Sequence, residues 1–211
     1  MLHNVSNKIS KLTILCLFLL SSCTTTMVDR AAKYNKYKVL SNISAVDSSF
    51  SELESLLYVD IKSQNMYLLR KGTILKVFKI SSSYYGTGST VNSLKTPLGK
   101  HEIYKKIGQD LPINAILKGR VWNGAVANVI TEDIDTDFDH VTSRILWLDG
   151  LENGKNKGPG VDSRSRYIYI HGTAEEGLIG RPASDGCIRM YNTDVIDLFD
   201  LVNEKAQVWI Y

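Results

Sequence analysis

A cysteine and a histidine close together in the sequence are the residues best suited to covalent chemistry. Cys187 follows a glycine, and His171 lies sixteen residues earlier, at the end of a run rich in tyrosine and isoleucine. A cysteine attacks an acyl carbon only as the thiolate, so it needs a base and surroundings that lower its pKa. A histidine at the end of a β-strand is a rigidly placed base. These residues predict an acyl-transfer site with Cys187 as the nucleophile and His171 as the general base.

The chain between these two residues is suited to bring them together. The loop from Ala174 to Ala183 contains two glycines and a proline, so the chain can reverse and return Cys187 to His171. Gly186 leaves room for a substrate, and the main-chain N–H groups of Gly186 and Cys187 are candidates for an oxyanion hole. The carbonyl of Gly172 is the nearest acceptor for orienting the imidazole, because a backbone oxygen can select its tautomer.

The N-terminal residues have the order of a secretory signal. Lys8 and Lys11 precede the apolar stretch Leu12–Leu20, and the small residues Ser21 and Ser22 follow. The apolar stretch is too short to span a membrane by itself. We therefore expect residues 1–22 to be a signal peptide that takes no part in the fold.

The end of this signal resembles a bacterial lipobox, Leu20-Ser21-Ser22-Cys23, in which the cysteine is lipidated. The alternative is an ordinary signal peptide that ends near a cysteine. Residues 23–50 are expected to form the lipidated N-terminus and a polar spacer, with a short helix around Arg30–Lys33. By sorting rules known for lipoproteins, Thr24 after the lipidated cysteine favours a periplasm-facing anchor in the outer membrane.

Processing also changes the cysteine count and the charge. Of three cysteines, Cys16 leaves with the signal and Cys23 carries the lipid, so Cys187 is the one remaining thiol and has no internal disulfide partner. Residues 1–22 contain two lysines and no acidic residue, so the formal net charge of +3 falls to +1. That balance gives no support to nucleic-acid binding, which requires a concentrated basic face.

From about residue 55 the sequence is rich in β-strand patterns. Alternating apolar residues separated by polar turns predict an antiparallel meander followed by further strands. One helix is expected after Met190, with Asn192 or Thr193 as its N-cap and Val195, Leu198, Phe199 and Val202 on one face. The chain is therefore expected to be mainly β, with one domain over residues 51–211. The predicted strands are 56–61, 66–70, 74–80, 145–148, 166–170 and 207–210.

Several other residues carry weaker signals. His101 lies in a strand-like stretch and His140 follows an acidic loop, so both are read as structural. The acidic loop Thr131–Asp139 has a spacing faintly like a calcium loop but lacks its glycine and terminal glutamate, which favours a solvated loop over a metal site. Trp122 and Trp147 either border a substrate groove or fill the core.

The site motifs resemble one known family. His171-Gly172-Thr173 followed by Ser184-Asp185-Gly186-Cys187-Ile188-Arg189-Met190 resembles the L,D-transpeptidase catalytic domain of the YkuD type. Upstream, Thr96-Pro97-Leu98-Gly99 and the stretch Thr142–Leu148 occur in the family's order, and the resemblance covers roughly residues 55–211. It implies an L,D-transpeptidase-like β-sandwich or mixed sheet with a short C-terminal helix.

The resemblance also implies roles for particular residues. Cys187 would be the nucleophile, His171 the base, and Gly172 the carbonyl that orients the histidine. The substrate pocket and oxyanion hole would be lined by Ser184, Asp185, Gly186 and Arg189, with Arg189 suited to the carboxylates of a peptide stem. Asp185 departs from the pattern, because the family most often has histidine there, and its charge is expected to raise the pKa of Cys187.

The reaction implied is a two-step acyl transfer that needs no cofactor and no metal. A cysteinyl thioester forms with a peptidoglycan tetrapeptide stem, D-alanine leaves, and an amine of a second stem, an envelope-protein lysine or water resolves the thioester. The alternatives are an L,D-carboxypeptidase or amide hydrolase, and a non-catalytic, lipid-anchored wall-binding module, which Asp185 keeps open. Papain-like hydrolases and sortases order their cysteine, histidine and arginine differently.

Overall fold

The computed structural model describes residues 35–136 and 139–211, in two units divided between Ser48 and Ser49. The expected signal peptide, Cys23 and the short helix around Arg30–Lys33 lie outside these residues. In the first unit, residues 35–46 are helical, although the sequence favoured a spacer there. Val39 and Ile43 are four residues apart and so share one side of this helix. Within the described ranges, no helix has the length and apolar character needed to cross a membrane.

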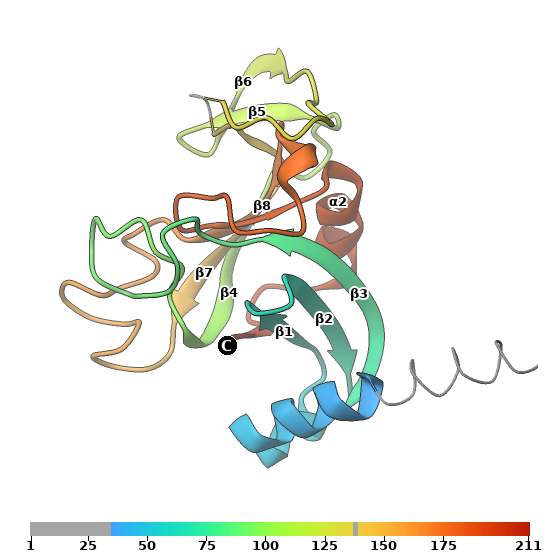
Figure 1. The fold of residues 1–211 in the computed structure, drawn as a ribbon, viewed down its shortest axis with the longest axis vertical. Coiled ribbons are helices and arrows are strands. Elements are labelled where there is room, and N and C mark those ends of the chain that lie inside the picture. The colour runs from blue at the N-terminus through green and yellow to red at the C-terminus, as the bar shows by residue number, and fades with distance from the viewer. Residues whose placement is uncertain (1–34, 137–138) are drawn as a thin grey trace, which may run out of the picture. The chain divides into compact units, whose positions relative to one another are not determined.

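The second unit, residues 49–211, contains ten strands (Figure 1). It also has two short 3-10 helices and one α-helix. In chain order the elements are η1 (Ser48–Glu52), β1 (Leu56–Asp60), β2 (Asn65–Arg70), β3 (Thr73–Ser81), β4 (Gly99–Ile107), β5 (Ala115–Lys118), β6 (Val121–Val126), β7 (Val141–Gly150), β8 (Tyr169–Thr173), η2 (Glu176–Leu178), β9 (Ile188–Met190), α2 (Asn192–Leu201) and β10 (Gln207–Ile210).

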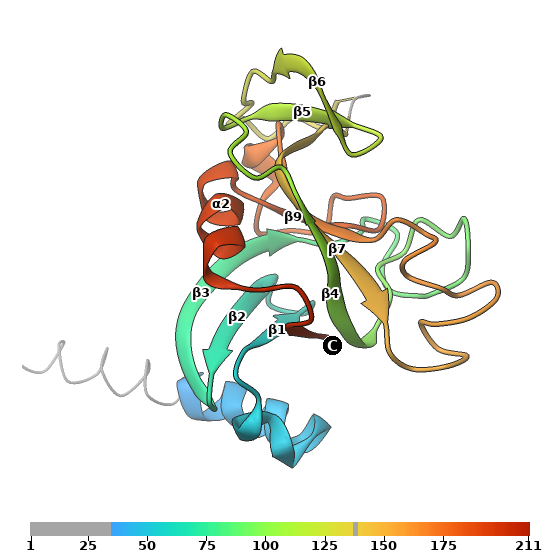
Figure 2. The same cartoon turned by 180° about the vertical axis from the view of Figure 1, so that it is seen from behind.

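The ten strands belong to one mixed sheet, ordered β4-β10-β1-β2-β3-β9-β8-β7-β5-β6. Strand β4 pairs with β7 as well as with β10, so the ring of pairings closes and only the β5–β6 hairpin extends beyond it. The pairs β1–β10 and β8–β9 are parallel and the other pairs are antiparallel. In Figures 1 and 2 the hairpin stands at one end of the sheet. The expected mainly β fold with a mixed sheet and a short C-terminal helix is confirmed.

The hydrophobic core fills the inside of the closed sheet. Alternate residues of the strands, such as Leu57, Ile80 and Ile188, are fully buried there together with Val195, Leu198 and Phe199 of α2. Helix α2 packs against β7 and β8. Because side chains alternate between the two faces of a strand, the neighbours of these core residues point outward. The outward residues of β8 and β9 are buried as well, on the opposite face of the sheet, which carries the candidate site.

Two local expectations need correction. Strand β8 does not begin at Arg166, because Asp162 Oδ1 accepts the Ser165 N–H and holds a turn through Tyr167, so the strand runs from Tyr169 to Thr173. Neither Asn192 nor Thr193 is the N-cap of α2. The cap residue is Tyr191, which makes no side-chain cap hydrogen bond, whereas the side chain of Asn192 is used elsewhere.

Candidate active site

The parallel pairing of β8 and β9 brings the two predicted catalytic residues onto one face. His171 pairs with Arg189, and Ile170 with Ile188. Cys187 immediately precedes β9, two residues before Arg189. Residues two apart in a strand face the same side, so His171 and Cys187 are diagonal neighbours on the outer face, opposite the core residues Ile170 and Ile188.

The imidazole of His171 is buried and its orientation is fixed. Only 1% of the residue is exposed, and Nδ1 lies 2.7 Å from the carbonyl oxygen of Gly172. Because a carbonyl oxygen only accepts hydrogen bonds, this contact assigns the proton to Nδ1. Nε2 therefore carries the lone pair that a base needs.

Gly172 is a glycine because a buried amide packs directly against it. A Cβ at this position would lie 2.6 Å from Asn192 Oδ1 and 2.9 Å from the Thr142 carbonyl oxygen. The side chain of Asn192 is itself fully bonded: Oδ1 accepts from Thr142 Oγ1 and Ser143 Oγ, both at 2.6 Å. Its Nδ2 donates to the Thr173 carbonyl at 2.7 Å and to Glu176 Oε1 at 2.8 Å. This network joins β7 to the end of β8 and so holds the strand that carries His171.

Cys187 lies in a partly exposed position against an aromatic cluster. Its Sγ accepts the N–H of Tyr169 at 3.4 Å and lies 3.5 Å from the carbonyl oxygen of Tyr167. The side chain packs on a small outer cluster that includes Tyr169, Ile145 and Trp147. The sulfur is therefore held by the backbone that enters β8.

The surroundings of Cys187 and His171 favour the neutral form of both side chains. Burial is the main cause that raises the pKa of Cys187 to about 12, even though the residue is partly exposed; the negative charge of Asp139 adds to the rise, and Arg189 and Arg166 oppose it. Burial also lowers the pKa of His171, against the opposing effect of Asp139. Cys187 is therefore a thiol and His171 a neutral imidazole in this structure.

The effect expected of Asp185 belongs instead to Asp139. Asp185 is exposed, and the carboxylate that raises the pKa of Cys187 is that of Asp139. Asp185 borders two cavities. One also contains Asp139 and Arg189, and the other contains Arg166 and Tyr167. Its position is therefore at the rim of the site.

The loop before Cys187 is held by two hydroxyl groups. Thr96 Oγ1 donates to the Gly186 carbonyl at 3.1 Å, and Ser184 Oγ donates to the Cys187 carbonyl at 2.5 Å. In a trans peptide the N–H points opposite to the carbonyl, so the Cys187 N–H points away from Thr96. Gly186 has a φ of 119°, which favours glycine, and its N–H lies 3.3 Å from Ser184 Oγ.

Arg189 is already paired with two carboxylates. Only 2% of it is exposed; Nη2 lies 2.8 Å from Asp139 Oδ2, and Nη1 lies 2.9 Å from Glu175 Oε2. Its Nε has no hydrogen-bond partner among the described residues. Arg189 lines a cavity as expected, but its charge is neutralised internally, which weakens its case as a ligand for a stem carboxylate.

Glu175, which no sequence pattern singles out, is buried and joins the 131–139 loop to β9. Its Oε1 accepts from the Thr136 N–H at 2.8 Å and from the Thr136 hydroxyl at 2.5 Å, while its other oxygen pairs with Arg189. A second acid of the 131–139 loop, Asp133, is paired with Arg181. Asp133 and Asp139 of this loop are thus used in ion pairs. A buried glutamate whose partners are distant in sequence leaves no local signal.

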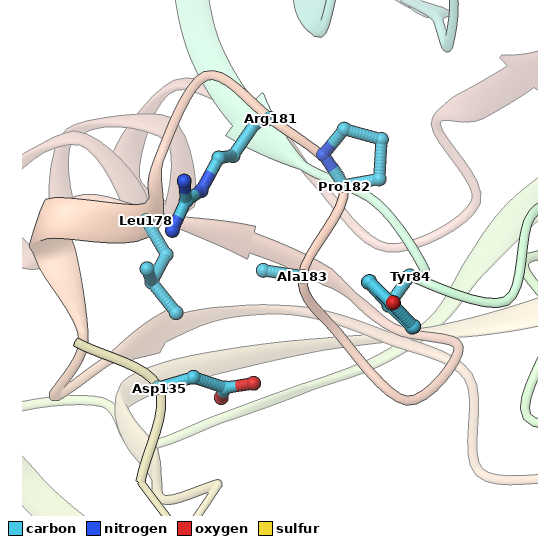
Figure 3. Close-up of a pocket in the computed structure, with 6 residues that line it drawn as sticks. All are labelled: Tyr84, Asp135, Leu178, Arg181, Pro182 and Ala183. Carbon is cyan, nitrogen blue, oxygen red and sulfur yellow. The ribbon is translucent and has the colours of Figure 1, made fainter. Parts of the chain in front are cut away.

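A cavity lies where this loop meets the β8–β9 connection (Figure 3). Asp135 contributes from the loop, Tyr84 from the segment after β3, and Leu178, Arg181, Pro182 and Ala183 from the connection. The neighbouring cavity that contains Arg189 shares Tyr84, Asp135 and Ala183 with it. The two cavities are therefore adjacent, and the one that contains Arg189 is also lined by Asp185.

The remaining candidates are structural or peripheral. His101 is buried, with Nδ1 3.0 Å from the Gly99 carbonyl and Nε2 3.0 Å from Ser163 Oγ. Trp147 lies on the outer face, where its ring meets Tyr169 edge-on. Trp122 is 40% exposed on β6. Of the two tryptophans, Trp147 is the one beside Cys187.

Comparison with known proteins places these features in a family. The family model described as L,D-transpeptidase catalytic domain, YkuD, matches residues 54–210. Two proteins of Bacillus subtilis (strain 168) are similar over short stretches. Putative L,D-transpeptidase YkuD is 47% identical over 49 residues, which cover 23% of this chain and 30% of that protein. Putative L,D-transpeptidase YqjB is 44% identical over 52 residues, which cover 24% and 28%. The matches thus span less than a third of each relative.

Solved structures show more distant similarity. An L,D-transpeptidase from Mycobacterium smegmatis aligns with a TM-score of 0.44 and 14% identity, over 75% of this chain and 58% of that chain. L,D-transpeptidase 3 from Mycobacterium tuberculosis, in complex with a faropenem-derived adduct, aligns with a TM-score of 0.46 and 13% identity, over 74% and 60%. The family model matches residues 54–210, which is most of the chain, and it includes the strands and the loop that carry His171 and Cys187. The chain therefore belongs to the L,D-transpeptidase catalytic domain family.

Proposed function

We propose that this chain is a peptidoglycan L,D-transpeptidase that acts through a thioester on Cys187. The observation that carries the proposal is the pairing of β8 with β9, which sets a thiol beside an imidazole whose Nδ1 is held by a carbonyl. A nucleophile, a base and a group that orients the base are the elements that acyl transfer requires. The substrate would be the tetrapeptide stem of peptidoglycan.

In the first half-reaction the thiol proton passes to His171 Nε2 as the sulfur attacks the carbonyl carbon of the third stem residue. The oxyanion that forms would be stabilised by the N–H of Cys187, which points away from Thr96. The C–N bond then breaks, and the proton on Nε2 passes to the amine of the departing D-alanine. The thioester remains on Cys187 and His171 is neutral again.

In the second half-reaction an amine attacks the thioester carbonyl. His171 accepts a proton from this amine and returns it to the sulfur as the C–S bond breaks. A stem amine gives a 3-to-3 cross-link, a lysine of an envelope protein gives a wall-anchored protein, and water gives a shortened stem. All three products come from one acyl-enzyme.

The neutral resting state fits this order of events. Burial opposes both a thiolate and an imidazolium in the free enzyme. During attack the charge moves from sulfur to the carbonyl oxygen, so a lasting thiolate is not required. Arg189 and Arg166 favour the anionic form of Cys187 and would assist at that moment.

The test is to incubate the full chain in detergent with disaccharide tetrapeptides and to analyse the products by mass spectrometry. We expect released D-alanine, a thioester adduct on the protein, and dimers whose ratio to tripeptides rises with the concentration of the acceptor stem. Cys187→Ala should form neither adduct nor product. His101→Gln is a matched control, since it removes a buried imidazole that lies elsewhere. Equal activity in wild type and Cys187→Ala would refute the proposal.

We further propose that Cys23 carries a lipid that anchors the enzyme at the outer membrane, facing the periplasm. The basis is the sequence Leu20-Ser21-Ser22-Cys23 that ends the apolar segment. Cys23→Ser should move the protein from the membrane fraction to the soluble periplasmic fraction. A membrane fraction unchanged by this substitution would exclude the lipid anchor.

A further inference from the structure

Arg120 projects from the tip of the β5–β6 hairpin. Lys118 pairs with Val121, so Gly119 and Arg120 form a two-residue turn, and their φ values of 57° and 70° are those of a type I′ turn. Glycine or asparagine is usual at such positions, because left-handed backbone is unfavourable for other residues. A long cationic side chain at this place calls for an explanation.

The guanidinium group of Arg120 lies on an aromatic platform. Its central carbon is 4.8 Å from the centre of the Trp147 ring and 4.9 Å from the centre of the Tyr167 ring. Nη1 also donates to the hydroxyl of Tyr169 at 3.1 Å. Stacking and the hydrogen bond fix the plane of the cation, so the donors that remain have defined directions.

The same two tyrosines hold the nucleophile. The N–H of Tyr169 and the carbonyl of Tyr167 contact the sulfur of Cys187. Burial raises the pKa of the Tyr169 hydroxyl, and the hydrogen bond and positive charge of Arg120 oppose this rise. Arg120 and Cys187 therefore contact the same two tyrosines, Arg120 through their side chains and Cys187 through their backbone.

Arg120 differs from the other arginines near the site in its partners. Arg189 is buried between two carboxylates, and Arg166 donates to the carbonyls of Gly88 and Lys95. In the part of the chain that the structure describes, Arg120 has aromatic partners and no carboxylate partner. A guanidinium carries five N–H donors, of which the side chains of Tyr169 and Tyr167 use two. Its charge and most of its donors are available to a ligand.

We propose that Arg120 binds the C-terminal carboxylate of the acyl donor. This inference rests on the proposed function, in which the terminal residue of the stem is released. That carboxylate is separated from the carbonyl under attack only by the amide nitrogen and one α-carbon. A donor whose reactive carbonyl is at Cys187 thus has its carboxylate close to the aromatic platform. The fork of a guanidinium matches the two oxygens of a carboxylate.

This role has a consequence for the two half-reactions. The carboxylate departs with the first product, so Arg120 acts on acylation and not on the resolution of the thioester. Loss of Arg120 should therefore weaken acylation by carboxylate donors and leave the partition between amine and water unchanged. A role limited to holding the hairpin would affect all donors equally.

The experiment compares two donors with the full chain in detergent. One donor is a disaccharide tetrapeptide with a free C-terminal carboxylate, and the other is the same molecule with a C-terminal carboxamide. Hydrogen bonds to charged groups correspond to about a 10- to 100-fold difference in kcat/KM, so wild type should prefer the acid by this factor. Arg120→Gln should bring the acid-to-amide ratio close to one, mainly through KM. Arg120→Lys, which keeps the charge without the fork, should give an intermediate ratio.

Arg164→Gln is the matched control. Arg164 also lies over an aromatic ring, at 4.9 Å from the centre of Tyr104, but it faces the carboxylate of Asp149. The Arg164→Gln substitution also removes one positive charge stacked on an aromatic ring. The acid-to-amide ratio of kcat/KM should stay as in wild type.

Two results would overturn the carboxylate site alone: an active wild type with equal kcat/KM on both donors, or an unchanged ratio in Arg120→Gln. A wild type that acts on neither donor would overturn the proposed function, and the site with it.

Discussion

Asn192 offers the sharpest test of how the fold supports the site. Asn192→Ala removes the acceptor of two hydroxyl groups, on Thr142 and Ser143, and the donor to the carbonyl of Thr173. All these residues are buried. Each buried polar group left without a hydrogen-bond partner lowers the free energy of unfolding by about 1–3 kcal/mol. Because hydroxyl groups can rotate toward other acceptors, we expect a total loss of about 3–5 kcal/mol in the free energy of unfolding.

Urea unfolding at neutral pH measures this loss. With an m-value of about 2 kcal/mol per molar, the midpoint should fall by about 2 M. Catalysis should also suffer, because a displacement of about 1 Å at His171 can lower the rate about 100-fold. Thr193→Ala, at the exposed neighbouring position, should leave both quantities close to wild type.

Asn192→Asp tests the acceptor role of this side chain apart from its donor role. The introduced carboxyl group still accepts from Thr142 and Ser143, but it loses the donors and stands where the amide nitrogen lay 2.8 Å from Glu176 Oε1. Burial and this neighbour would raise the pKa of the introduced group above its unfolded value. The destabilisation should therefore grow as the pH rises above about 4 and shrink below it. If Asn192→Ala unfolds within about 0.5 kcal/mol of wild type, the network does not stabilise the fold and the reasoning fails.

Three further results are expected. Alkylation of Cys187 by iodoacetamide should speed up steadily from pH 7 to pH 10, because burial raises the thiol pKa to about 12; a plateau reached by about pH 10, as for a cysteine peptide with a pKa of about 8.5, would contradict this. His101 has its pKa lowered to about 4 by burial, so protonation of the unfolded chain should remove up to about 3 kcal/mol of stability as the pH falls from 6.5 to 4, and His101→Gln should flatten this dependence in acid titrations. Gly186→Ala should cost about 1–3 kcal/mol in thermal unfolding, since its φ of 119° is unfavourable for alanine although a Cβ would have space.

Local patterns were sufficient for much of the fold. The meander β1–β3 and strand β10 were predicted because alternation and polar turns are properties of neighbouring residues. Strand β9 was not predicted, since it has only three residues and depends on parallel pairing with β8. The start of β8 was placed too early because the turn held by Asp162 follows a tertiary arrangement rather than an apolar pattern.

The same division applies to the candidate site. Its cysteine, histidine and glycines occur in a short stretch of sequence, so their proximity could be predicted. The charged residues around the site could not be predicted. Asp139 forms an ion pair with Arg189, which is fifty residues away in the sequence, and Glu175 bonds to a loop that has no periodic pattern. No sequence pattern pointed to Arg120, because its position is set by stacking on Trp147 and Tyr167, which are distant in the sequence.

The position of β10 in the ring of strands has a consequence for how the protein reaches its native state. Gln207–Ile210 lie between β1 and β4, parallel to one and antiparallel to the other. Until this segment has been synthesised and inserted, β1 and β4 each expose an open edge, and the closed ring cannot form. Sheet closure therefore pairs segments that are about 150 residues apart in sequence. Because contacts between distant segments form slowly, we expect closure to be a slow and late step of folding. A chain cut before Gln207 should retain the residues of the site and yet aggregate through its unpaired strands.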